Sequence, residues 1–281
     1  MSKRSWLFGT IAASAWHVAA LLLAIGTLVP GTSFAQELSD EWKFGAFLYG
    51  YLPQIKGSTT FPAGITANIS VSPNQLISNL KFTFMGSLAA QKGHWGLFTD
   101  VLYVDVGGSK SGARDLRIGD ITIPAGITAD ADLGIKSTLW TLGGSYRVVA
   151  SPETTFDVLA GARLLDLKEN LGWQFNADIG PFVGPGRQGS SEVSANKWDA
   201  IIGVKGRFAF GDNHEWFMPY YLDVGTGQTQ LTWQAIAGLG YAFSWGDVIA
   251  LWRYIDYHFK STDAFGSLSL NGPAIGVAFH W

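Results

Sequence analysis

A run of strictly alternating side chains between residues 197 and 210 limits the folds open to this chain more than any other feature. A period of two places successive side chains on opposite faces of a β-strand. One face carries Asp199, Lys205 and Arg207 among small and apolar residues. The other face is apolar throughout and consists of Trp198, Ala200, Ile202, Val204, Gly206, Phe208 and Phe210. An apolar face bounded by aromatic rings, opposite a charged face, predicts a strand between lipid and a polar lumen.

Ten segments share this alternation, and very short connections alternate with long ones along the chain. We expect strands near residues 42–52, 80–91, 95–106, 134–148, 154–167, 197–210, 215–225, 230–243, 247–258 and 268–281. The longest connections cover residues 53–79, 107–133 and 168–196. Short periplasmic turns and long extracellular loops are typical of outer-membrane barrels. The pattern predicts an all-β fold, an antiparallel up-and-down transmembrane β-barrel of about ten strands, and counts of eight or twelve are also compatible.

The last segment, Ile275 to Trp281, alternates in the same way and ends on an aromatic residue. Its predicted lipid face consists of Ile275, Val277, Phe279 and Trp281. A strand of this kind has to close the only free edge of a barrel. We therefore interpret Phe279 and Trp281 as the signal that the barrel-assembly machinery reads, and we expect that machinery, periplasmic chaperones and outer-membrane lipid as partners.

The N-terminal segment predicts export. Lys3 and Arg4 precede an apolar stretch from Ile11 to Leu28, and Ser33-Phe34-Ala35 places small residues where a signal peptidase cuts. The alternative is a spanning helix, but polar residues dilute the apolar stretch. We predict a signal peptide over residues 1–35, cleaved after Ala35, and a barrel domain over residues 36–281 in the outer membrane of a Gram-negative bacterium.

Composition narrows the class further. The chain has 12 Trp, 9 Tyr and 18 Phe but no Cys, so the fold has to close without disulfides. Beyond the predicted signal, no apolar run is long enough to span a membrane as a helix. Removing residues 1–35 takes 2 of the 19 basic residues and none of the 22 acidic ones, which leaves a formal charge of −5. This balance offers no basic stripe for nucleic acid.

Charged residues on the polar faces should meet in the lumen. By parity they are Lys43, Lys81, Asp100, Arg147, Asp157, Arg163, Asp199, Lys205, Arg207, Glu215, Asp223 and Arg253. Because unpaired charges in a narrow lumen are costly, we expect a salt-bridged network in which Arg163 and Arg207 pair with carboxylates such as Asp157, Asp199 or Asp223. A plugged interior and a narrow, weakly anion-preferring pore both agree with this. The determinants of such a pore would be Arg163, Lys205, Arg207 and Arg253.

The long connections contain an internal repeat. Residues 62–67 read Pro-Ala-Gly-Ile-Thr-Ala and recur letter for letter at residues 124–129. Pro-Ala-Gly favours a tight turn between two β-prone arms, so each copy predicts a ribbon above the membrane. After the first copy, residues 72–79 predict a short helix with Ser72 as N-cap and Pro73 at its first position. We expect this helix to lie at the barrel mouth.

Several sequence segments resemble those of a known group of proteins. They are Trp95-Gly96-Leu97-Phe98-Thr99-Asp100-Val101-Leu102-Tyr103, Pro219-Tyr220-Tyr221-Leu222-Asp223-Val224-Gly225-Thr226-Gly227, Thr232-Trp233-Gln234-Ala235 and Tyr254-Ile255-Asp256-Tyr257. Together they are similar to a widespread group of uncharacterised outer-membrane β-barrel proteins of Gram-negative bacteria, which resembles small surface antigens and porins. The resemblance covers nearly all of the mature chain and implies fold and compartment, with no substrate or catalytic residue to carry over.

One motif suggests an enzyme. Asp256-x-His258 is similar to the Asp-His pair of omptin proteases, and Asp130-x-Asp132 is similar to their acidic pair. In those proteases the two pairs activate a water molecule that lies between them. Parity argues against this, since Asp256 and His258 share a face with the lipid-facing Trp252 and Tyr254. No metal-ligand or phosphate-loop spacing is present. We therefore predict a non-enzymatic barrel without cofactor or metal, a surface scaffold or a narrow porin-like channel, with a surface adhesin and an omptin-like protease as alternatives.

Overall fold

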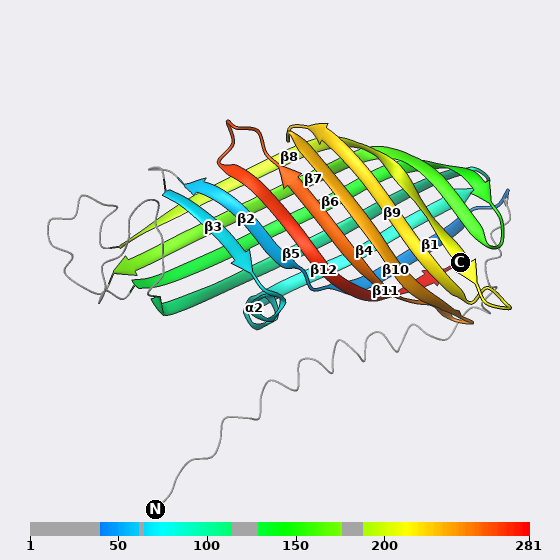
Figure 1. Cartoon of the computed structure of the whole chain (residues 1–281), viewed down its shortest axis with the longest axis horizontal. Coiled ribbons are helices and arrows are strands. Elements are labelled where there is room, and N and C mark those ends of the chain that lie inside the picture. Colours follow the sequence, from blue (N-terminus) through cyan, green and yellow to red (C-terminus); the bar gives the residue numbers. More distant parts are fainter. Residues whose placement is uncertain (1–39, 62–64, 114–128, 176–187) are drawn as a thin grey trace, which may run out of the picture.

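A computed structural model describes residues 40–61, 65–113, 129–175 and 188–281, which form a closed antiparallel barrel with a small extension (Figure 1). The ten barrel strands are β1 (Lys43–Tyr51), β4 (Leu80–Lys92), β5 (Trp95–Ala113), β6 (Ala129–Ala150), β7 (Thr154–Phe175), β8 (Gln188–Phe210), β9 (Trp216–Gly227), β10 (Leu231–Phe243), β11 (Gly246–His258) and β12 (Phe265–His280). The prediction of a ten-strand barrel is confirmed. The predicted signal peptide and its cleavage after Ala35 lie outside the described residues.

Strand β12 closes the ring on β1. Their register runs from Gly45 opposite His280 to Tyr51 opposite Ala274. One residue further, the Phe44 amide donates to the Trp281 carbonyl at 2.9 Å, and the Trp281 amide returns the bond at 3.1 Å. Closure pairs backbone groups that would otherwise form a free edge in lipid.

The outer face carries an apolar band between two aromatic girdles. The periplasmic girdle includes Trp42, Trp95, Trp216, Phe243 and Trp281, all at least 43% exposed. The upper girdle consists of Phe82, Tyr103, Trp140, Trp198, Trp233 and Tyr254. Directly above it the outward residues turn polar, and they include Asp105, Lys136, Asp166 and Asn196. This order places the lipid bilayer between the two girdles.

Four neighbouring strands rise well above the membrane. Strands β5 to β8 have 19 to 23 residues, whereas β9, β10 and β11 have 12 or 13, and in Figure 1 the long strands reach furthest toward the left. The sequence predicts loops over much of this extra length, and that prediction is wrong for residues 107–113, 129–133, 168–175 and 188–196. These segments are strands because their inner side chains, such as Val193 and Ala195, are buried against a facing layer.

Strands β2 (Gln54–Phe61) and β3 (Ile65–Val71) and helix α2 (Pro73–Asn79) supply that facing layer. After a bend at Leu52 and Pro53, β2 continues along β12, and β3 folds back on β2. The predicted first ribbon is confirmed for its two arms, while its turn at residues 62–64 lies outside the described residues. The second copy of the repeat also lies outside them, apart from Ala129 in β6.

Helix α2 begins where the sequence predicts. Ser72 is the N-cap and Pro73 follows it, and Ser72 and Gln75 form a capping box in which each side chain accepts from the other's backbone amide. No helix within the described ranges is long and apolar enough to cross a membrane.

The four predicted periplasmic turns are short, as expected. Gly93 and Gly211 have φ values of 54° and 91°, in the left-handed region that glycine adopts without a steric penalty. These tight turns hold neighbouring strands in register at the periplasmic end and fix which side chains point into the lumen.

Candidate functional site: the layers of the lumen

Ten inward side chains, one from each barrel strand, form a layer across the lumen that we call the sealing layer. Each is at most 7% exposed. Its members are Tyr51, Met85, Leu102, Thr141, Arg163, Ile201, Asp223, Gln234, Arg253 and Ala274. A water-filled pore leaves the side chains around it accessible to water, so this burial closes the lumen at this level.

Arg163 crosses the sealing layer from β7. Its Nη2 donates to Asp223 Oδ2 on β9, its Nε to Thr141 Oγ1 at 3.2 Å and its Nη1 to Thr232 Oγ1 at 3.4 Å. The side chains of Arg163 and Asp223 have no exposed surface. Because each buried charge offsets the other, loss of one partner would strand the second in a site without water.

Arg253 makes a second cluster on the opposite side of the lumen. Its Nη2 donates to Asp100 Oδ1 at 2.7 Å and to Gln234 Oε1 at 2.9 Å, and its Nη1 donates to the Tyr49 hydroxyl at 2.6 Å. Tyr49 in turn donates to Asp100 Oδ2 at 2.8 Å. Tyr51 donates to the Arg253 carbonyl at 3.0 Å, so the guanidinium is fixed from several strands.

The remaining predicted charges lie in separate contacts. Asp157 binds Arg147 in a two-bond pair of 2.8 and 3.1 Å, and Asp199 accepts from the Thr229 amide and hydroxyl, both at 2.8 Å. The cations of two further residues lie over aromatic rings. Lys205 Nζ is 4.4 Å from the Phe98 ring centroid, and Arg207 Cζ is 5.2 Å from that of Phe217. The predicted charges of the lumen described so far thus point inward but form several local clusters, and they are Asp100, Arg147, Asp157, Arg163, Asp199, Lys205, Arg207, Asp223 and Arg253.

Two other residues expected in the lumen lie elsewhere. Lys81 sits at a β-bulge between Leu80 and Phe82, which shifts the parity, and its ammonium group lies against Gly107 on the outer side. Glu215 lies in the turn before β9 and accepts from Asn213 Nδ2 at 2.9 Å. Both errors arise at strand ends, where period two breaks down.

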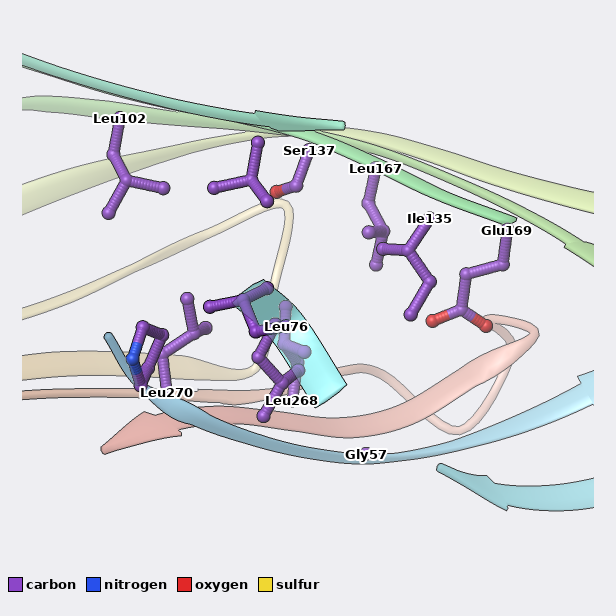
Figure 2. A pocket seen from close by; sticks show the side chains of 12 residues that line it. Gly57, Leu76, Leu102, Ile135, Ser137, Leu167, Glu169, Leu268 and Leu270 are labelled. Atoms are coloured by element: carbon purple, nitrogen blue, oxygen red, sulfur yellow. The ribbon is translucent and has the colours of Figure 1, made fainter. Parts of the chain in front are cut away.

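Above the sealing layer the lumen becomes an apolar chamber (Figure 2). It encloses a cavity of about 20 Å³, roughly the space of one water molecule. Its lining is Pro53, Ile55, Gly57, Leu76, Leu102, Val104, Ile135, Ser137, Leu167, Glu169, Leu268 and Leu270. Sequence reasoning missed this chamber because five of its twelve lining residues come from segments that are predicted as connections.

Glu169 is the charged residue of the chamber lining. It is 4% exposed and accepts from Thr59 Oγ1 at 2.7 Å, a bond that joins β7 to β2. Its position, three residues above the outward Asp166, places it outside the membrane band. Burial raises the pKa of this carboxyl to about 7, although the hydrogen bond from Thr59 acts in the opposite direction.

The Asp-His pair of the omptin-like alternative lies on the outer face. Asp256 Oδ1 is 2.9 Å from His258 Nε2, and Tyr254 donates to Asp256 Oδ2 at 2.9 Å. The alternate residues Ile255 and Tyr257 are fully buried toward the lumen. The pair therefore points away from β6, which carries Asp130 and Asp132 on the opposite wall. The side chains of those two aspartates lie outside the described residues. Within the described ranges, no group of three His, Cys, Asp or Glu residues could hold a metal.

The closed ring, apolar outer band and aromatic girdles define a transmembrane β-barrel of the Gram-negative outer membrane. No family model matches the chain, and no curated protein sequence matches it.

Solved structures similar to it are also outer-membrane barrels. The outer membrane protease OmpT from Escherichia coli is 10% identical, with 88% of this chain and 98% of that chain covered and a TM-score of 0.48. The translocator domain of autotransporter NalP from Neisseria meningitidis is 14% identical, with 95% and 96% covered and a TM-score of 0.40. Ail, the attachment invasion locus protein of Yersinia pestis, is 10% identical, with 86% and 99% covered and a TM-score of 0.29. Likenesses this low carry no information on activity.

Proposed function

We propose that this protein is a closed barrel that serves as a membrane-embedded scaffold for the structure it holds above the outer membrane. The sealing layer is the observation that supports this proposal. A side chain from each of the ten barrel strands is buried there, and two arginines are held by carboxylates across the lumen. A general diffusion porin needs a continuous aqueous path, which such a layer interrupts.

Planar-bilayer recording of the purified protein tests the proposal. The wild type should show no steady conductance. The double variant Arg163→Ser, Asp223→Ser replaces the buried pair with small polar groups and should produce small openings. Openings of the variant also show that protein purified and added in the same way enters the bilayer.

Leu142→Ala is the matched control, since it removes side-chain volume on the outer face, where Leu142 is 49% exposed. It should behave as the wild type. A steady wild-type conductance that selects weakly for anions would contradict the scaffold proposal and favour the porin-like alternative based on Arg163, Lys205, Arg207 and Arg253.

The protease alternative has less support, because Asp256 and His258 lie on the outer face of β11. The adhesin alternative depends on residues 114–128 and 176–187, which lie outside the described residues. The scaffold proposal is compatible with any surface role of those residues.

A further inference from the structure

The barrel wall is interrupted beside the apolar chamber. Pairing between β1 and β4 ends at Leu48 opposite Gly86, and β3 pairs with β2 alone. Beyond that point, residues 80–85 of β4 have no strand partner on the β1 side within the described ranges. The Tyr51 amide donates at 3.2 Å to the Met85 sulfur in place of a strand carbonyl. The wall therefore has a lateral gap between β3 and β4.

Helix α2 covers this gap. Its buried residue is Leu76, at 2% exposed, and Figure 2 shows its side chain between the wall that carries Ile135 and Leu167 and the strand that carries Leu268 and Leu270. Polar side chains of the helix make local bonds, such as Ser78 Oγ to the Asn74 carbonyl. Leu76 is thus the one apolar side chain of α2 that anchors this helix to the chamber.

The outer side of the gap is apolar as well. Ile77 is 55% exposed and Phe82 59%. Phe82 contacts Tyr103 in the upper girdle, with ring centroids 5.8 Å apart, so this surface lies at the level of the outer leaflet. Apolar side chains therefore lie on both sides of this cover, with Ile77 and Phe82 exposed outside and Leu76 buried in the chamber.

We propose that the chamber is a binding site for a single alkyl chain with a hydroxyl or amino head group, which enters from the outer leaflet when α2 moves aside and Leu76 leaves the chamber. The slender, leucine-rich lining suits a hydrocarbon chain. Glu169, Thr59 and Ser137 suit a head group that donates hydrogen bonds, and a carboxylate head would meet the like charge of Glu169. The present cavity of about 20 Å³ is too small for such a molecule, so Leu76 has to yield its place.

Photolabelling tests the site. The full barrel in phosphatidylcholine vesicles is irradiated with decanol that carries an aliphatic diazirine, and labelled residues are identified by mass spectrometry. We expect labels on the inward residues Ile135 and Leu167. Leu76→Ala should raise this labelling severalfold by opening space, and Leu76→Trp should reduce it to background by filling the space. The same diazirine on decanoic acid should label these positions less at pH 8.

Matched controls are Leu142→Ala and Leu142→Trp, which change the same volumes on the outer face and should leave inward labelling unchanged. Heat-modifiable migration confirms that each variant is folded. Labels confined to outward residues, or equal inward labelling in both Leu76 variants and the wild type, would refute the site. Conductance of the wild type would refute the scaffold proposal and leave this result unaffected.

A disulfide tests the route of entry. The chain has no cysteine, so Leu80→Cys with Val106→Cys gives one possible pair, at residues that are already opposite each other on β4 and β5. The disulfide fixes the C-terminal end of α2 to β5. In the oxidised form the inward residues should therefore be labelled severalfold more slowly, and reduction should restore the labelling rate. Equal labelling rates before and after reduction would rule out movement of α2 as the entry step.

Discussion

Replacement of Glu169 by Gln should stabilise the barrel at alkaline pH. The amide has the shape of the carboxyl group and its oxygen still accepts the hydrogen bond from Thr59, but it carries no charge. The pKa of Glu169 is about 7 in the folded chain against an ordinary value of 4.5. At 1.36 kcal/mol per pKa unit, that difference corresponds to about 3 kcal/mol.

The direction in which stability changes with pH depends on whether the folded or the unfolded chain binds the Glu169 proton more tightly. Below pH 4.5 the carboxyl is protonated in both states, so the folded chain pays no free-energy penalty for burying a charge. Between pH 4.5 and about 7 the unfolded chain releases the proton while the folded chain keeps it, so the free energy of unfolding falls. Above pH 7 the loss is complete. The Gln variant has no such loss, so the two proteins should match at pH 4 and differ by about 3 kcal/mol at pH 8.

Urea titrations of barrels folded into lipid vesicles, followed by tryptophan fluorescence at pH 4 and pH 8, measure this difference. Glu192→Gln is the control, because Glu192 is exposed on the neighbouring strand of the same extension. It should leave stability nearly unchanged at both pH values. If Glu169→Gln gains nothing at pH 8 while the wild type is equally stable at both pH values, then Glu169 is hydrated and the chamber is not closed.

Three further variants test other layers of the barrel. Arg163→Met should lower the free energy of unfolding by about 3 kcal/mol, since it strands Asp223 in a buried site, and addition of Asp223→Leu should recover most of the loss; an unchanged urea midpoint in the single variant would indicate a hydrated lumen. Replacement of Phe279 and Trp281 by Ser should leave unfolded protein in the periplasm, and normal heat-modifiable migration would refute the assembly role. His258→Ala should be without effect in whole cells incubated with a basic peptide, and cleavage by the wild type that this variant abolishes would make the chain an enzyme.

The outer face of the barrel was predictable from sequence because lipid imposes the same rule on every strand. A charged side chain such as Asp199 is too costly to place in lipid, so it takes an inward position. The outward positions on the same strand, such as Trp198 and Ile202, are therefore apolar without exception. The lumen has no such rule. Asp157 could bind any cation within reach, and whether Arg147 or Arg207 reaches it depends on register and shear, which period two does not specify.

The chamber was harder to predict for a different physical reason. Above the membrane the outside of β7 is wet, so Asp166 and Lys168 alternate with Leu167 and Glu169, the reverse of the pattern below. In the membrane the outward face of each strand is apolar, whereas here it is polar. A segment with this reversed alternation is therefore predicted as a loop and not as a continuation of the strand. The barrel therefore changes from a lipid-facing shell with a charged interior to a water-facing shell with an apolar interior. The lateral gap lies at that change, where apolar side chains are found both outside, at Phe82, and inside, at Leu76.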